Sequence, residues 1–386
     1  MLKLIKEGEV YCPDYIGKKD ILITGNKIGY IDDNITIPKN FVDIEVIDAK
    51  GKKVVPGFID SHVHIIGGGG EGGFKTRTPE IQLTDIITGG VTTVIGVLGT
   101  DGTTRTMANL LAKARALEEE GISTYVHTGS YQVPVRTVTG SIQDDIILID
   151  KIIGVGEIAL SDHRSSQPNV DDIAKLTAEA RVGGILSGKS GVVNIHVGSG
   201  DRTIDCLEEI VKNTEIPINQ FLPTHMIRNE RLFNKGIEFA KKGGVIDFTT
   251  STSDSGETGC SKYLKKVLDK GVSIDNITFS SDGQGSLPKF DKEGNFIGLG
   301  VGKVTSLYNE VKKGLVDGDV TLEDGLKVIT ANPARILKLR NKGYIRENND
   351  GDIVILDKDL NIDTVIAMGK IMIRNKEIVE KGIFEK

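Results

Sequence analysis

Two histidines separated by one residue follow a short apolar run near the start of the chain. Residues 56–64 read PGFIDSHVH, which places His62 and His64 two positions apart. A single histidine beside apolar neighbours is usually a satisfied core residue, because the ring buries its body and hydrogen-bonds its tip. On a strand, side chains two positions apart project from one face, about 6 to 7 Å apart along the strand. The pair therefore indicates a site for a metal ion.

More histidines and carboxylates occur within or just after other apolar runs. Glu157 lies in IIGVGEIAL, His196 in VVNIHV, His225 after NQFLPT and Asp282 after NITFSS. Neutral imidazole and carboxylate oxygen are ligands that suit Zn²⁺. Polar residues also fill the mouths of barrels, so a structural role is an open alternative for each residue alone. Four histidines and two carboxylates placed in the same way favour a metal centre.

Eight apolar, β-branched runs must position these residues. They are VVPGFIDSH, VTTVIGV, STYVHTG, IIGVGEIAL, VVNIHV, NQFLPTH, GVIDFTT and NITFSSD. Stretches with helical periodicity, such as RTMANLLAKARALEEEG, lie between them. Strands that alternate with helices imply right-handed crossovers and a parallel sheet, so eight units predict an α/β fold with a (β/α)8 TIM barrel. Catalytic residues in such barrels come from the C-terminal ends of the strands, where these histidines and carboxylates fall.

The two ends of the chain have a different pattern. Residues 1–53 and 343–386 hold short apolar runs separated by turn residues, as in DILITGNKIGYIDDN and GDIVILDKDLNID. Neither segment alone has enough strands for a stable sheet. We therefore expect both to form one small β-sandwich domain beside a barrel of residues 54–342. Two separate hairpins that rest on the barrel are the alternative.

Composition narrows the class of protein and of partner. The chain has 386 residues, of which 38% are hydrophobic and 26% charged, as is typical of a soluble globular protein. Its net charge of -6 gives no basic footprint for nucleic acid, which favours a small-molecule partner. Three scattered cysteines argue against a disulfide framework and a thiolate metal cluster. With no signal-peptide core and no 18-residue apolar run, we expect a cytoplasmic protein without a membrane association.

Several motifs carry a resemblance to a known family. PGFIDSHVH, the isolated histidines in NIHVG and LPTH, and SSDG resemble the amidohydrolase superfamily of metal-dependent hydrolases. More narrowly, HVHIIGGGGEGG, RTPE, LGTDG, TGSYQVP, SDHRS and SSDGQGS resemble the β-aspartyl (isoaspartyl) dipeptidases, through almost the whole chain. The resemblance implies a homo-oligomeric metalloprotease with two divalent ions per chain, usually zinc. It also implies hydrolysis of the isopeptide bond of β-aspartyl dipeptides by a hydroxide that bridges the ions.

The same resemblance implies how the metal ligands divide between two ions. His62 and His64 hold one ion with Asp282, and His196 and His225 hold the other. Asp282 is also the implied catalytic group that takes a proton from the attacking water and passes it to the leaving amine.

The ligand that bridges the two ions differs from the family pattern. The resembling dipeptidases commonly use a carbamylated lysine there, whereas IIGVGEIALSDHR offers a glutamate and no lysine. Counting back from SDHR favours Glu157, and counting forward from IIGV favours Gly156, so an extra residue is indicated at this point. Gly156 has no side chain to bind metal, so Glu157 is the expected bridge. A buried glutamate paired with a basic residue is the alternative.

A β-aspartyl dipeptide carries one ammonium and two carboxylates, and each needs a partner. Glu71 in the glycine-rich loop is expected to receive the ammonium, with a solvated loop charge as the alternative. Tyr131 is implied as the catalytic group that polarises the carbonyl or stabilises the oxyanion, and a packed aromatic is its alternative. His127 is expected to fill the barrel interior, and the role of His163 is open. The remaining residues expected to bind substrate, the first three through its carboxylates, are Arg164, Arg228, Ser286 and Thr100.

Two rival interpretations remain. One is another amidohydrolase that acts on cyclic amides or N-acyl amino acids, and the other is a non-catalytic barrel used for binding. Arg164, Arg228 and Glu71 together favour a small zwitterionic substrate over a cyclic one. Retention of every ligand type argues against the non-catalytic barrel.

Overall fold

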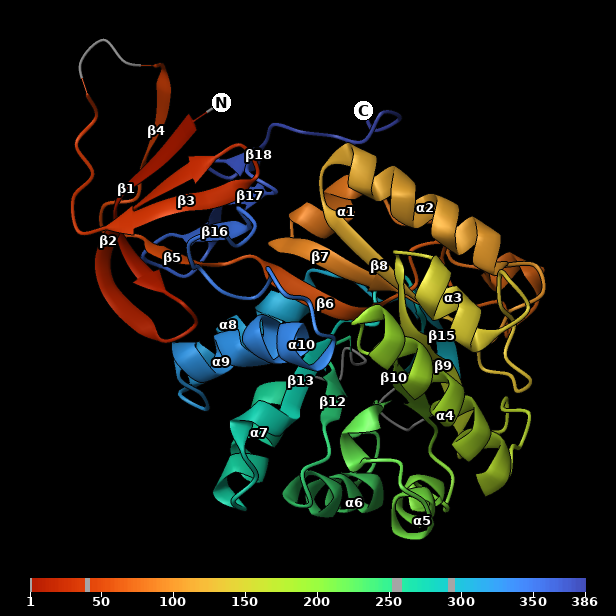
Figure 1. Ribbon diagram of the computed structural model, residues 1–386. Coiled ribbons are helices and arrows are strands. Elements are labelled where there is room, and N and C mark those ends of the chain that lie inside the picture. The colour runs from red at the N-terminus through yellow and green to blue at the C-terminus, as the bar shows by residue number, and fades with distance from the viewer. Residues whose placement is uncertain (1, 39–41, 252–258, 291–295) are drawn as a thin grey trace.

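The structure is a computed structural model that describes residues 2–38, 42–251, 259–290 and 296–386. A barrel surrounded by helices lies beside a β-sheet that contains strands from both ends of the chain (Figure 1). Among the described residues, no helix combines the length and the apolar composition that a membrane crossing requires.

Eight strands of the described chain form the barrel. In chain order they are β6 (Phe58–Val63), β7 (Val91–Gly96), β8 (Ser123–Thr128), β9 (Ile152–Leu160), β10 (Val192–Val197), β11 (Phe221–Thr224), β12 (Ile246–Thr249) and β13 (Ile277–Ser280). The first six form one parallel sheet in sequence order, and β12 pairs in parallel with β13. Hydrogen bonds from Met226 N to Asp247 O (3.2 Å) and from His64 N to Gly283 O (2.8 Å) join the two sheets. Each of the eight apolar runs therefore contains a strand, as predicted, and the fold is of the TIM-barrel type.

Helices follow the barrel strands and cover their outer faces (Figure 1). They are α1 (Leu83–Ile87), α2 (Met107–Glu120), α3 (Ile142–Leu148), α4 (Val170–Ser187), α5 (Asp205–Asn213), α6 (Glu230–Lys241), α7 (Cys260–Asp269), α8 (Ser306–Asp317), α9 (Leu322–Ile329) and α10 (Ala331–Ile336). Local sequence sets their ends. For example, Asn169 and Asp172 form a capping box at the start of α4, and Gly188 ends that helix with φ +70. Short 3-10 turns occur at Phe74–Thr76, Ile218–Gln220 and Ile274–Asn276, and a hairpin of β14 (Ser286–Phe290) and β15 (Phe296–Val301) follows β13.

One nine-stranded sheet combines the two ends of the chain. Its strands are β1 (Leu2–Tyr11), β2 (Tyr15–Thr24), β3 (Lys27–Asp32), β4 (Ile44–Asp48), β5 (Lys53–Pro56), β16 (Ile353–Leu356), β17 (Ile362–Ala367), β18 (Lys370–Arg374) and β19 (Glu377–Ile378). The antiparallel pairing of β5 with β16 joins the N-terminal and C-terminal strands, which differs from two separate hairpins. A core of mostly Ile and Val side chains, including Ile21, Ile23 and Ile355, lies within this sheet. Its arrangement as a sandwich domain bounded at residues 53 and 343 stays a prediction.

The buried cation Lys342 connects the terminal sheet to the barrel. Its Nζ lies 2.6 Å from Asp352 Oδ2, 2.7 Å from Asp350 Oδ2 and 2.6 Å from Ser123 Oγ at the start of β8. Burial would lower the pKa of Lys342, but the two carboxylates outweigh it and raise the pKa above its ordinary value. The ammonium group is therefore charged in the folded protein and neutralises the buried carboxylate of Asp352, whereas Asp350 also pairs with Lys27.

Replacing Lys342 with Met is expected to lower the free energy of unfolding by about 3 to 5 kcal/mol, because the change leaves Asp352 buried without its cation. Urea denaturation followed by circular dichroism measures the effect. Lys327→Met is a matched control, since Lys327 pairs with Asp14 at 2.9 Å where the Asp14 side chain is 68% exposed. That surface pair is expected to contribute less than about 1 kcal/mol. Equal losses in both variants would contradict the connecting role of Lys342.

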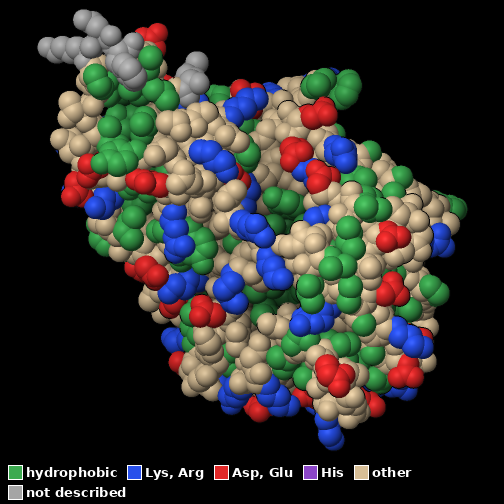
Figure 2. Space-filling view, viewed as in Figure 1, with side chains coloured by type: hydrophobic (Ala, Val, Ile, Leu, Met, Phe, Trp, Pro, Cys, Tyr) green, Lys and Arg blue, Asp and Glu red, His purple; other side chains and the backbone are tan. Residues whose placement is uncertain are grey.

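The surface in the orientation of Figure 1 mixes hydrophobic, basic and acidic side chains, and no histidine shows on it (Figure 2). This agrees with the burial of His62, His64, His196 and His225, each of which is at most 5% exposed. The histidines that were predicted to bind metal therefore lie inside the barrel.

Candidate active site

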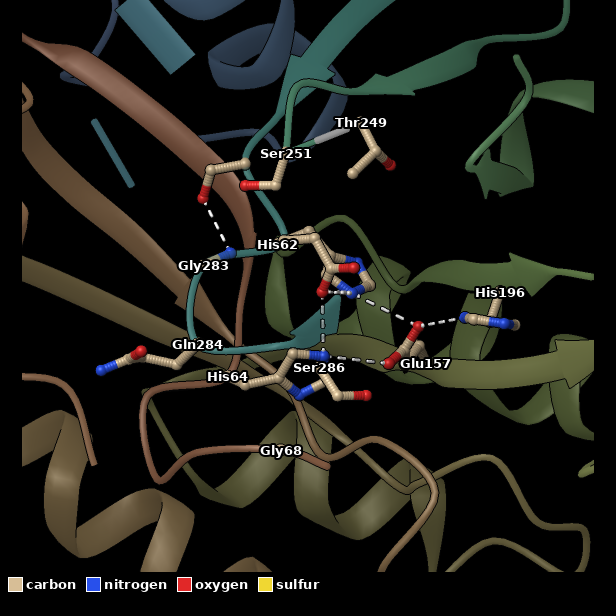
Figure 3. Close-up of polar contacts among 12 residues, drawn as sticks. His62, His64, Gly68, Glu157, His196, Thr249, Ser251, Gly283, Gln284 and Ser286 are labelled. Atoms are coloured by element: carbon tan, nitrogen blue, oxygen red, sulfur yellow. Dashed lines mark hydrogen bonds and ion pairs between the residues drawn. The ribbon is translucent and has the colours of Figure 1, made fainter. Parts of the chain in front are cut away.

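The six side chains expected to bind metal converge inside the barrel. Glu157 lies between His196 on one side and His62 and His64 on the other (Figure 3). Its Oε2 is 3.3 Å from His62 Nε2 and 3.0 Å from His196 Nδ1, and its Oε1 is 3.4 Å from His64 Nε2. Asp282 Oδ1 is 3.1 Å from His64 Nε2, and His225 Nε2 is 3.0 Å from His196 Nδ1. The strands thus bring these six residues to one place.

The donor atoms of this cluster fit divalent cations. In the described part of the chain, His62 Nε2, Glu157 Oε1 and Asp282 Oδ1 are buried and have no hydrogen-bond partner. Two ligand atoms on one tetrahedral zinc ion lie about 3.4 Å apart, because each is about 2.1 Å from the ion. Donor atoms of His62, His64 and Asp282 lie within 4.8 Å of one another, as do those of His62, Glu157 and His225. Both groups contain His62, so the cluster offers ligand atoms at metal-binding distances on either side of this residue.

The electrostatics of the cluster favour positive charge at its centre. Burial would lower the pKa of His62, but the carboxylates of Glu157 and Asp282 outweigh it and raise the pKa to about 9. Burial would raise the pKa of Asp282, but the neighbouring imidazole of His64 outweighs it and holds the pKa at about 2. In the same way, His62 and His196 hold the pKa of Glu157 well below its ordinary value against the effect of burial. A cation among these groups would meet stabilising negative charge.

A β-bulge in β9 directs Glu157 toward the cluster. Val155 pairs with Val193 and Ile158 pairs with Ile195, so β9 has one more residue than β10 between these pairs. Gly156 in the bulge has φ +144, and a Cβ there would lie 2.7 Å from the carbonyl oxygen of Asn194. This position therefore requires glycine. The bulge agrees with the extra residue that counting along the sequence indicated.

Two of the expected ligands have an unusual backbone. His225 directly follows β11 and has φ +66, and Asp282 stands two residues after the end of β13 and has φ +54. Residues other than glycine rarely adopt this conformation, and such residues concentrate at functional sites. The hydroxyl of Thr249 lies 2.6 Å from His225 Nδ1, which leaves His225 Nε2 to face the cluster.

Tyr131 lies beside the cluster on the segment that follows β8. Its hydroxyl is 2.8 Å from His196 Nδ1. Backbone hydrogen bonds from Tyr131 N to Gly99 O (3.3 Å) and from Ala159 N to Tyr131 O (3.1 Å) hold the residue in place. Burial raises its pKa well above the ordinary value, so the hydroxyl keeps its proton and remains a hydrogen-bond donor.

Glu71 has partners from three other segments. Its carboxylate accepts hydrogen bonds from Thr100 Oγ1 (3.1 Å), Ser286 Oγ (3.1 Å) and Arg164 NH1 (3.0 Å). The structure thus brings together four of the residues expected to bind substrate. Ser286 and Arg164, both expected to bind substrate carboxylates, contact the acidic Glu71 here.

The glycine-rich loop that carries Glu71 is held by a buried arginine. Arg105 donates hydrogen bonds to the carbonyl oxygens of Gly68 and Thr78, each at 3.0 Å, and also to that of Ile66. These carbonyls flank Glu71 on both sides along the chain, so Arg105 fixes both ends of the loop.

Arg164 and Arg228 differ in how many partners they have. Arg164 donates from Nε to Asp162 Oδ1 (2.9 Å) and from NH2 to Asp162 Oδ2 (2.8 Å), in addition to its contact with Glu71. Arg228 NH1 approaches Asp162 Oδ2 at 3.9 Å, beyond hydrogen-bonding distance. Arg228 therefore has more donors available for a ligand than Arg164.

Sequence reasoning missed two residues of the site, Asp162 and Thr249. Asp162 stands two positions before Arg164 in SDHRS, and a carboxylate so close to an expected binding arginine was the available signal. Thr249 gave no such signal. His127 is fully buried on β8, as predicted, and burial lowers its pKa to about 3. His163 is exposed, and its Nδ1 lies 3.6 Å from Asp162 Oδ1.

Comparison with known proteins finds one family and two kinds of similar enzyme. The model of the Amidohydrolase family matches residues 53–372. The crystal structure of the β-aspartyl dipeptidase from Fervidobacterium islandicum AW-1 in complex with β-Asp-Leu dipeptide is 49% identical, covers 98% of this chain and 97% of that chain, and superimposes with a TM-score of 0.92. A second structure described as this enzyme is 46% identical, covers 98% of both chains and has a TM-score of 0.90. A dihydroorotase from Clostridium acetobutylicum is 26% identical over 92% of this chain and 90% of its own length.

Proposed function

Because the chain belongs to the amidohydrolase family, we propose that it hydrolyses the isopeptide bond of β-aspartyl dipeptides with two divalent metal ions, expected to be zinc. The observation that carries the proposal is the placement of an acidic and a basic side chain, Glu71 and Arg228, around the ligand cluster. Asp162 lies between Arg228 and the expected ligand His196. Arg164 contacts both Asp162 and Glu71. A small zwitterion matches this arrangement, and the 49% identical relative is described as a β-aspartyl dipeptidase bound to β-Asp-Leu.

We assign the metal ligands as the family resemblance implies. His62 and His64 with Asp282 would hold one ion, His196 and His225 would hold the other, and Glu157 would contact both. When bound, the ions would polarise the scissile carbonyl and lower the pKa of the attacking water.

Asp282 and Tyr131 are the proposed catalytic residues. Asp282 Oδ1 faces the cluster 3.1 Å from His64 Nε2 and has no hydrogen-bond partner among the described residues, so it is placed to take a proton from water and give it to the leaving amine. The protonated hydroxyl of Tyr131 lies beside the same cluster and would donate to the carbonyl oxygen as it becomes negative.

The charges around the cluster suggest how the substrate is oriented. Glu71 would receive the ammonium group, with Thr100 and Ser286 holding its carboxylate in place. Arg228 has the free donors and would take a carboxylate directly, as a forked pair. Arg164 already donates to Asp162 and Glu71, so any contact it makes with a second carboxylate would be shared with these groups.

Other expectations from the sequence join this proposal. They are a homo-oligomeric assembly, a cytoplasmic location, and a β-sandwich domain of residues 1–53 and 343–386 beside a barrel domain of residues 54–342.

The second candidate is an amidohydrolase with a different substrate, which the similarity to a dihydroorotase favours. With a cyclic amide or an N-acyl amino acid, neither of which has a free ammonium, Glu71 would keep Arg164 as its cationic partner and would receive none from the substrate. The charge arrangement therefore favours the dipeptide.

A substrate panel tests the proposal. Hydrolysis of β-Asp-Leu, α-Asp-Leu, N-acetyl-β-Asp-Leu, N-acetyl-leucine and dihydroorotate is compared on protein purified without chelator, and elemental analysis counts the metal. We expect about two ions per chain, because four histidines and two carboxylates exceed what one tetrahedral ion uses. We also expect the highest kcat/KM for β-Asp-Leu. Preference for dihydroorotate or N-acetyl-leucine would overturn the substrate, and full activity with one ion would overturn the binuclear site.

Replacing Arg228 with Met is expected to lower kcat/KM for β-Asp-Leu by about 10- to 150-fold, because a charge-assisted hydrogen bond contributes about 1.5 to 3 kcal/mol. Steady-state kinetics on β-Asp-Leu and on β-Asp-Leu amide measure the change. The amide lacks the carboxylate of the leaving residue, so it should lose less if Arg228 binds that carboxylate. Arg231→Met is a matched control, since Arg231 pairs with the exposed Asp201 at 2.7 Å. Equal losses on the free and amidated substrates would contradict this role of Arg228.

A further inference from the structure

The carboxylate of Asp162 lies between an expected metal ligand and an arginine. Its Oδ2 is 3.1 Å from His196 Nε2 and 2.8 Å from Arg164 NH2. Its Oδ1 accepts hydrogen bonds from Arg164 Nε (2.9 Å) and from the backbone N–H of Arg164 (2.8 Å). The Asp162 side chain is 4% exposed. Buried and held by several donors, this carboxylate has a fixed position.

The two nitrogens of His196 face different surroundings. Nδ1 points into the ligand cluster, where it is 3.0 Å from Glu157 Oε2, 3.0 Å from His225 Nε2 and 2.8 Å from the hydroxyl of Tyr131. Nε2 points the other way, toward Asp162. A neutral imidazole carries one proton, so Nδ1 has a free lone pair for a metal ion when the proton is on Nε2. The carboxylate of Asp162 next to Nε2 favours that arrangement because it can only accept, and it opposes Glu157 Oε2, which by the same reasoning favours a proton on Nδ1.

A competing donor stands beside the same nitrogen. Arg164 NH2 is 3.3 Å from His196 Nε2. If Nε2 accepted a hydrogen bond from this guanidinium, the imidazole proton would have to move to Nδ1, and the lone pair that faces the cluster would be lost. Asp162 Oδ2 accepts hydrogen bonds from both Arg164 NH2 and His196 Nε2, and so keeps the proton of His196 on Nε2.

We propose that Asp162 is a positioning residue that keeps His196 in its Nε2–H tautomer by occupying the donors of Arg164. The proposal rests on the assignment of His196 as a metal ligand in the proposed function. In this proposal Arg164 would compete with the metal ion for His196 if its guanidinium donated to Nε2. Asp162 prevents this by accepting the hydrogen bond from Arg164, which leaves Arg164 beside the substrate.

The experiment compares the metal-free and metal-titrated forms of the parent protein and three variants, and a fourth variant serves only to identify the His196 resonance. ¹⁵N NMR of histidine side chains reports the tautomer of His196 in the metal-free protein, with the resonance identified by its loss in His196→Asn. Zn²⁺ titration against a competing chromophoric chelator measures the affinity for the second ion. For Asp162→Asn we expect a shift toward the Nδ1–H tautomer and an affinity about 10- to 100-fold weaker, the usual effect of removing the partner of a ligand histidine.

A double variant separates this mechanism from simple loss of a contact. In Asp162→Asn/Arg164→Met the competing donor is absent, so we expect the Nε2–H tautomer to return and the affinity for the second ion to recover by several-fold. Recovery would be the result specific to the proposal. An unchanged tautomer in Asp162→Asn, or a double variant that binds zinc as weakly as Asp162→Asn, would overturn it.

Asp101→Asn is the matched control. Asp101 also holds an arginine, with Arg77 NH1 at 2.6 Å, and also accepts backbone N–H groups, from Thr103 and Thr104. No contact between Asp101 and a histidine occurs in the described part of the chain, so its tautomer and zinc readings should match those of the parent. A zinc defect in Asp101→Asn equal to that in Asp162→Asn would overturn the specific role. If the parent protein did not hydrolyse β-Asp-Leu, the proposed function would be wrong, but the metal measurements would still test the role of Asp162.

Discussion

An Asp282→Asn variant is expected to lose about 100- to 10,000-fold in kcat with a much smaller change in KM, because it removes proton transfer and keeps the shape of the site. Asp282 Oδ1 is buried in the cluster, 3.1 Å from His64 Nε2. The amide of asparagine has an oxygen that can still face a cation, but it does not take up a proton at neutral pH. Steady-state kinetics on β-Asp-Leu measure both constants.

The metal content of Asp282→Asn distinguishes its two proposed roles. If the variant keeps about two ions per chain, the loss in kcat belongs to proton transfer. If it loses an ion, Asp282 acts mainly as a ligand, and kinetics at saturating Zn²⁺ then isolate the remaining effect. A kcat within a few-fold of that of the parent at full metal loading would show that the proton-transfer role is wrong.

Replacing Glu157 with Gln is expected to reduce the metal content from about two ions to one or fewer per chain, because the change removes the anion that faces both groups of histidines. Glu157→Ala should bind still less metal, since it removes the ligand atoms as well. Elemental analysis after reconstitution of the metal-free protein measures the content, and loss of activity should follow it.

Added bicarbonate supplies the matching control for Glu157. A carbamylated lysine forms only with dissolved carbon dioxide, whereas glutamate carries its carboxylate permanently. Reconstitution of the parent protein is therefore expected to proceed equally well with and without bicarbonate. A requirement for bicarbonate, or a Glu157→Gln variant with two ions and parental turnover, would mean that another residue bridges the ions.

The barrel could be predicted because of how its strands are buried. Parallel strands in a barrel are covered on both faces, so their sequences are continuous apolar runs, as in VTTVIGV and VVNIHV. The pairing of the chain ends carried no comparable signal. VVPGFIDSH looks like one strand, yet the structure divides it into β5 in the terminal sheet and β6 in the barrel. β5 belongs to the terminal sheet because it pairs with β16, which is far away in the sequence. The hairpin of β14 and β15 was also missed.

The convergence of the four histidines and two carboxylates could be predicted because their residue types are distinctive and they stand within or just after predicted strands. The partners of those ligands could not be predicted so directly. Asp162 contacts His196 only because the segments after β9 and within β10 meet at the mouth of the barrel, and the hydroxyl of Thr249 meets His225 in the same way. Spacing within one segment carries no information on such contacts. The pairing of Arg164 with Glu71 likewise depends on two loops 93 residues apart.

The pairing of β5 with β16 has a consequence for how the chain is made. β5 begins at residue 53 and β16 at residue 353, so 353 minus 53, or 300 residues, separate their starts. A ribosome that adds about 5 to 20 residues per second needs about 15 to 60 s to synthesise that length. Throughout this time β5 presents an unpaired edge, of the kind that invites pairing with other chains. The terminal sheet is therefore the last part of the molecule to close, and a nascent chain that stalls before residue 353 exposes the edge that chaperones and proteases can recognise.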